Sequence, residues 1–100
     1  MDDKKKYMVE FEVPVPFTEE LKELIPEQQS AVYSLFIDGK LLNYTLSMDR
    51  TKLWALFIAD SESALLTYID KLPLSQYMNF DYKEIMIHEA VQFIPAISLN

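Results

Sequence analysis

Histidine is the only side-chain type whose unperturbed pKa lies near neutrality, and the chain contains one, His88. Such a residue can act as a general acid or base when a substrate proton lies within reach and a neighbouring group orients the imidazole ring. Glu10 and Glu84 are the candidates for that neighbouring group. A histidine at the end of a strand can also donate a hydrogen bond to a carbonyl, so the sequence leaves both roles open.

Glu10 and Glu12 stand two residues apart in a stretch that alternates apolar and polar side chains. On a β-strand this spacing puts both carboxylates on one side of the sheet. Carboxylates that lie close together can raise one pKa and form an acid/base pair, whereas on an exposed face they are merely solvated. One histidine with carboxylates does not match the usual metal-ligand sets, so we predict no metal site and no cofactor.

A few other side chains could contact a ligand. Arg50 could bind an anion through two hydrogen bonds, although an exposed arginine is also common in a turn. The aromatic residues that could line a pocket, or instead fill the core, are Tyr44, Trp54, Phe57 and Tyr82. The sequence has no glycine-rich phosphate loop, no Ser-His-Asp pattern and no basic patch interleaved with aromatic residues.

Composition narrows the class of protein. The chain has 100 residues, of which 50% are hydrophobic, so it can form one domain with a core. Its net charge of −7 argues against nucleic acid or an anionic membrane surface as a partner. It has no cysteine, and no apolar run approaches the roughly 18 residues of a membrane span. We therefore expect a cytoplasmic protein.

Four segments have the pattern of strands. Residues 7–13 alternate strictly, and residues 41–48 alternate with Leu42 and Tyr44 on the same face. Residues 53–59 are apolar on both faces, which predicts a strand that is covered on both sides. A final strand is expected over residues 79–89, with Ile85 and Ile87 on one face and Glu84, Met86 and His88 on the other.

Two helices are expected between these strands. The first starts after Thr18, which can cap it. Pro26 should either kink this helix or split it into two pieces, and of these we expect the kink. The second is capped by Asp60 or Ser61 and ends at Pro73. The order strand, helix, strand, strand, helix, strand is that of a ferredoxin-like α+β fold, with both helices on one face of a four-stranded antiparallel sheet. The first and third strands should then be central.

The sheet face without helices is the expected site. The side chains assigned to it are Met8, Glu10, Glu12, Asn43, Thr45, Ser47, Glu84, Met86 and His88. Either Trp54 and its alternate neighbours or the set that includes Leu53 joins them, because parity alone does not decide. A second copy of the chain would cover this apolar face and leave a partly polar cavity between the sheets. In that cavity we expect substrate contacts from Glu12, Asn43, Trp54, Glu84 and Met86.

The segment Leu72-Pro-Leu-Ser-Gln-Tyr-Met-Asn-Phe, with His88 after it, resembles the muconolactone isomerase family. The positions that match the family pattern Leu-Pro-Leu-x-x-Tyr-Met-Asp-Ile are Leu72, Pro73, Leu74, Tyr77 and Met78. Gly39 and Ser61 also stand where the family has them. The resemblance implies a dimeric α+β barrel, or a larger ring of such subunits. It also implies a cofactor-independent isomerase that moves a proton on a small unsaturated lactone or acid.

Two departures from the family concern charge. The family has a basic, histidine-containing second strand, which here reads Asn43-Tyr-Thr-Leu-Ser-Met, and a lysine-type position of its first strand is Glu10.

The leading hypothesis is a homodimer that binds a small, partly apolar molecule, with His88 and Glu10 as the acid/base pair if it is catalytic. The alternatives are a non-catalytic binding or assembly module and a cofactor-independent monooxygenase-like protein.

We expect one domain over residues 7–90. Residues 1–6 should form a frayed N-terminus, because they are strongly charged. Residues 91–100 form an apolar tail that we expect to dock on its own or on a neighbouring subunit.

Overall fold

The computed structural model describes residues 4–88. The tail predicted over residues 91–100 and the first three residues of the predicted frayed N-terminus lie outside the described residues. Within the described range the first strand begins at Lys5, two residues before the start of the alternation. Lys5 and Lys6 are therefore part of the sheet, and the prediction that they are frayed is wrong.

A four-stranded antiparallel sheet forms one layer of the protein. Its strands are β1 (Lys5–Glu12), β2 (Leu41–Leu46), β3 (Lys52–Ala59) and β4 (Asn79–Ile85). They lie in the order β2-β3-β1-β4, so the first and third strands are central, as expected. This α+β arrangement is compatible with a ferredoxin-like fold.

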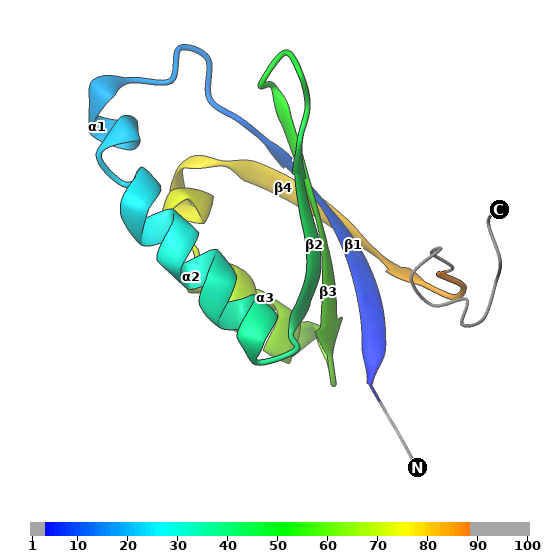
Figure 1. The fold of residues 1–100 in the computed structure, drawn as a ribbon. Coiled ribbons are helices and arrows are strands. Elements are labelled where there is room, and N and C mark those ends of the chain that lie inside the picture. The colour runs from blue at the N-terminus through cyan, green and yellow to red at the C-terminus, as the bar shows by residue number, and fades with distance from the viewer. Residues whose placement is uncertain (1–3, 89–100) are drawn as a thin grey trace, which may run out of the picture.

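The helices form the second layer. They are α1 (Glu19–Lys22), α2 (Ile25–Ile37) and α3 (Glu62–Asp70), followed by the 3₁₀ helix η1 (Pro73–Tyr77). Figure 1 shows the three α-helices on one side of the sheet. The core lies between the layers and contains side chains such as Tyr7, Val9, Phe11, Val32, Leu35, Phe57, Leu65 and Ile69.

The predicted caps are confirmed, but the predicted kink is not. Thr18 and Ser61 each accept a hydrogen bond from the backbone N–H three residues later, at the starts of α1 and α3. The chain splits into two helices around Leu24 rather than bending through one. Pro26 lies in the first turn of α2, where a missing N–H costs nothing because no intrahelical acceptor faces it. The prediction of a single kinked helix is therefore wrong.

A β-bulge changes which face of β2 is buried. Leu41 pairs with Phe57 and Asn43 pairs with Leu56, so Leu42 is the extra residue. Leu41 is consequently 2% exposed and lies in the core. The prediction that Leu42 shares the face of Tyr44 fails, because period-two alternation cannot anticipate an inserted residue.

The final strand is turned the other way from its predicted phase. Tyr7 pairs with Glu84 across β1 and β4, and Lys6 pairs with Ile85. Glu84 therefore lies on the helix side, and Ile85 on the opposite side. The reason is aromatic packing. Phe80 and Tyr82 have the parity of Glu84 and pack on the core rings, with Tyr7 and Tyr82 centroids 6.1 Å apart and Phe11 and Phe80 centroids 5.6 Å apart.

Candidate functional site

The helix-free face is the sheet surface formed by Lys6, Met8, Glu10 and Glu12 of β1 and by the side chains that pair with them. The register pairs Glu10 with Trp54 and Met8 with Leu56, so the Trp54 set of β3 lies on this face. Asn43 pairs with Leu56 and belongs to the same face. The structure thus brings four predicted site residues to one surface: Glu10, Glu12, Asn43 and Trp54.

Glu10 is held as a carboxylate rather than poised to exchange a proton. The indole Nε1–H of Trp54 donates to its Oε1 at 3.0 Å, and the Lys52 ammonium donates to its Oε2 at 3.2 Å. The Trp54 hydrogen bond, followed by the hydrogen bond and charge of Lys52, lowers the pKa of Glu10 below its usual value. A general acid near neutral pH needs a raised pKa, so this arrangement does not suit that role.

The other predicted site residues do not gather around Glu10. Strand β4 ends at Ile85, opposite Lys6, which lies four positions along β1 from Glu10. At about 3.4 Å per residue, that end of β4 is about 14 Å from Glu10 along the strand. Met86 is 97% exposed beyond this end, and His88 follows it. The prediction that the final strand extends to His88 is therefore wrong.

Glu12 and Glu84 have separate surroundings. Glu12 stays on the helix-free face, at the end of β1, where its register partners are Lys52 and Asn79. Glu84 lies on the helix side of β4 and is exposed, so its predicted place on the helix-free face is wrong. The sheet therefore separates Glu84 from both Glu10 and Glu12.

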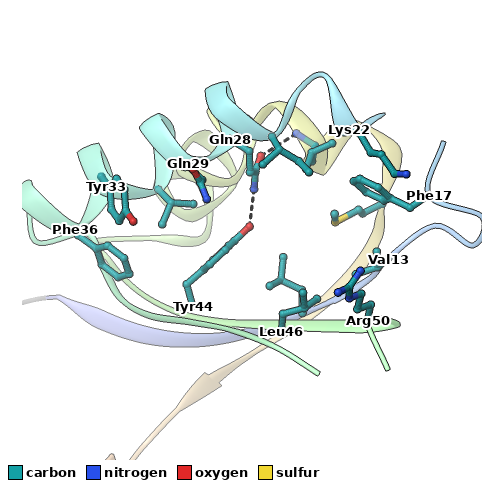
Figure 2. A pocket seen from close by; sticks show the side chains of 15 residues that line it. Val13, Phe17, Lys22, Gln28, Gln29, Tyr33, Phe36, Tyr44, Leu46 and Arg50 are labelled. Atoms are coloured by element: carbon teal, nitrogen blue, oxygen red, sulfur yellow. Dashed lines mark hydrogen bonds between the residues drawn. The ribbon is translucent and has the colours of Figure 1, made fainter. Parts of the chain in front are cut away.

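A cavity of about 690 Å³ lies on the other side of the sheet, between the helices and β2. We call it the α2–β2 cavity. Its wall is mostly apolar and includes Val32 and Phe36 of α2, Leu46 of β2, Leu53 of β3 and Leu74 of η1. Figure 2 shows the helix above and the sheet below, with the side chains directed into the space between them. This cavity belongs to a single chain and does not lie where the predicted site would be.

A buried glutamine joins the walls of the α2–β2 cavity. Gln28 is 4% exposed, and its Nε2 donates to the hydroxyl oxygen of Tyr44 at 2.9 Å. Its Oε1 accepts the backbone N–H of Leu74 at 2.9 Å. The side chain thus links α2, β2 and η1, and both ends of its amide are satisfied. Burial raises the pKa of Tyr44, although the hydrogen bond from Gln28 opposes this effect, so the phenol stays neutral in ordinary buffers.

One end of the α2–β2 cavity carries positive charge. Figure 2 shows Lys22 and Arg50 at the same end, together with Phe17 and Val13, while Tyr33 and Phe36 lie toward the other end. Among the described residues that line the cavity, none is Asp, Glu or His. The charged end therefore has the chemistry of an anion site, next to an apolar wall.

The hairpin turn fixes the backbone at Arg50. This residue has φ 63°, in the left-handed region that glycine and asparagine favour. Oδ1 of Asp49 accepts hydrogen bonds from the Ser47 hydroxyl, the Thr51 hydroxyl and the Thr51 N–H, at 2.7, 2.7 and 3.1 Å. These bonds lower the pKa of Asp49 and hold the turn that presents Arg50.

Sequence reasoning singled out Arg50 and Tyr44 as candidates but missed Gln28. A signal for Gln28 was present. It stands seven residues after Leu21 and four before Val32, both of which are buried, so it falls on the apolar stripe of the helical segment. A polar residue on such a stripe needs a buried partner, and the sequence does not show that Tyr44 and Leu74 supply it.

No family model of known proteins matches the sequence, and a search of curated proteins also finds no match. Within residues 4–88, no three His, Asp or Glu side chains come together in a way that could hold a metal ion. None of the helices in that range is long and apolar enough to cross a membrane.

Proposed function

We propose that this protein is a binding module that takes up one small, mostly apolar molecule in the α2–β2 cavity. The cavity itself supports the proposal, because its volume of about 690 Å³ and its mainly apolar wall fit a small organic ligand. The few polar groups in the wall, such as Gln28 and Tyr44, already bond to each other and would orient a ligand rather than react with it.

The proposal favours binding over proton transfer. An isomerase of the muconolactone type would need an acid or base beside its substrate. The described lining of the cavity contains no carboxylate and no histidine, and its other ionisable groups are Lys22, Arg50, Tyr33 and Tyr44. On the opposite side of the sheet, Trp54 and Lys52 lower the pKa of Glu10, which favours a permanent anion.

A neutral apolar fluorophore tests the proposed function without involving charge. We expect N-phenyl-1-naphthylamine to bind saturably, with enhanced fluorescence that indicates a dry site. Leu46→Trp, which adds bulk to the cavity wall, should weaken binding at least about tenfold. The matched control is Leu66→Trp on α3, because Leu66 is 42% exposed and Leu46 is 51% exposed. Absence of saturable binding, or equal weakening in both variants, would contradict the proposal.

A second role, self-association, is favoured by the composition of the helix-free face. Met8, Trp54 and Ile58 give it a partly exposed apolar centre. Its charges balance, with lysines and carboxylates in equal number: Lys6, Lys52, Lys83, Glu10, Glu12 and Asp81. Two copies can pair through this face without net electrostatic repulsion. The remaining surface carries the net charge of −7, so it would repel the same surface of a second copy.

We therefore propose that two copies pair through this face, as in a dimeric α+β barrel. Ile58→Glu should convert the dimer to a monomer in sedimentation velocity, because it would bury an added carboxylate in the contact. Thr67→Glu, at an exposed position of α3, adds the same charge away from this face and should leave the dimer intact. A wild-type protein that sediments as a monomer at high concentration would rule the dimer out.

A further inference from the structure

We propose that the ligand of the α2–β2 cavity is an organic anion, an apolar monocarboxylate, and that Arg50 is the residue that binds its carboxylate. This inference rests on the proposed function and adds the class of ligand. The anionic group would lie at the end formed by Arg50 and Lys22, and the apolar part would extend toward Tyr33 and Phe36 (Figure 2).

Charge is distributed unevenly between the cavity and the rest of the protein. The chain has 16 Asp and Glu against 9 Lys and Arg, yet the described charged residues that line the cavity are Lys22 and Arg50 only. Arg50 is exposed and 54% of the Lys22 side chain is accessible, so both cations are hydrated in the free protein. A neutral ligand gains nothing from these two charges, whereas an anionic ligand can form charge-assisted hydrogen bonds with them.

The backbone at Arg50 supports the same conclusion independently. A left-handed turn position is most easily occupied by glycine, and an arginine there is strained. The turn keeps this conformation because Asp49 bonds to Ser47 and Thr51. Arg50 thus has a backbone conformation that is unfavourable for arginine, at a position from which its guanidinium lines the end of the cavity. A guanidinium can bind both oxygens of a carboxylate.

Both cations are available to a ligand. Among the described residues, Arg50 forms no ion pair. Lys22 bonds to Glu19 at 3.1 Å, but that pair is exposed, with 87% of the Glu19 side chain accessible. Exposed pairs of this kind contribute little, so Lys22 can exchange Glu19 for a ligand carboxylate.

The test compares octanoate with methyl octanoate, which has the same chain without the charge, by displacement of N-phenyl-1-naphthylamine. We expect octanoate to bind at least about tenfold more tightly to the wild type. Arg50→Gly should remove that preference without changing the affinity for the ester or for the fluorophore, because glycine readily adopts the left-handed backbone conformation of this turn position. Arg50→Lys should keep part of the preference. Lys71→Gln is the charge-matched control, because Lys71 is exposed at the end of α3 and belongs neither to the cavity lining nor to the helix-free face, and it should leave both affinities unchanged.

The outcomes separate the two proposals. Equal affinity for the acid and the ester in the wild type, or an unchanged preference in Arg50→Gly, overturns the inference and leaves the binding function standing. Absence of any fluorophore binding overturns both. A higher salt concentration should weaken the binding of octanoate but not that of its ester, since salt screens only the charged contact.

Discussion

The indole N–H of Trp54 lies 3.0 Å from Oε1 of Glu10, across the register pair that joins β3 to β1. The second oxygen of the same carboxylate accepts from Lys52. Both donors stabilise the charged form of Glu10, and the Trp54 hydrogen bond has the largest effect on its pKa. The tryptophan that could have lined a substrate pocket instead fixes a carboxylate as an anion.

Replacing Trp54 by Phe should raise the pKa of Glu10 toward its usual value, because the main donor is lost. A side-chain carboxyl NMR titration measures this directly, and Lys52→Met should also raise the pKa, because it removes both a hydrogen bond and a positive charge. A group with a lowered folded pKa contributes stability above its unfolded pKa and loses it as the pH falls through the folded value. The contribution of Glu10 to the free energy of unfolding should therefore be lost in acid. An unchanged pKa in Trp54→Phe would show that the hydrogen bond is absent in solution.

Replacing Gln28 by Leu should lower the free energy of unfolding by about 2 kcal/mol, because it leaves the buried N–H of Leu74 without an acceptor. Urea denaturation measures the loss. The neighbouring Gln29 is exposed, so Gln29→Leu should change stability by less than about 0.5 kcal/mol. Similar losses in both variants would indicate that the three-way hydrogen-bonded link is unimportant.

The β-bulge predicts unequal effects for two adjacent leucines. Leu41→Ala should cost about 3 kcal/mol, because Leu41 is 2% exposed in the core. Leu42→Ala should cost less than about 1 kcal/mol, because the extra residue of the bulge lies outside that core. Urea denaturation of the two variants decides the register, and the reverse order would favour a regular strand over the bulge.

The hairpin turn should depend on pH through Asp49. The Ser47 and Thr51 hydrogen bonds lower its pKa, so its contribution is present above the ordinary pKa of aspartate and is lost as the pH falls through the lowered value. Asp49→Ala should therefore reduce the Tm at neutral pH and have little effect near pH 2. The exposed Glu84→Ala serves as the control and should leave the Tm unchanged at both pH values. A Tm loss for Asp49→Ala that is independent of pH would contradict this role.

Much of the fold could be predicted from local patterns. Alternation located β1 and β2, the helix caps at Thr18 and Ser61 followed from residue type, and the element order gave the central position of β1 and β3. These features succeed because each depends on neighbours within a few residues or on general rules of topology.

The errors have a different origin. The phase of β4 depends on Phe80 and Tyr82 packing against rings of β1, some 70 residues earlier in the chain. The backbone conformation of single residues decides two further features, the bulge at Leu42 and the start of a helix at Pro26. Hydrophobic periodicity is a pattern over many residues, so it does not report such local changes. The α2–β2 cavity could not be found by sequence patterns at all, because its walls come from segments that only the tertiary fold brings together.

The central position of β1 has a consequence for the order of folding. Its partners, β3 and β4, begin at Lys52 and Asn79, so β1 has neither of its sheet neighbours during synthesis until the chain has been extended through β3. The β2–β3 hairpin is the sheet's local pairing and can form early, whereas both ladders of β1 need closure of long loops. Until then β1 has two unpaired edges and exposes Tyr7, Val9 and Phe11, which are buried in the folded core, so this strand is open to misassociation during synthesis.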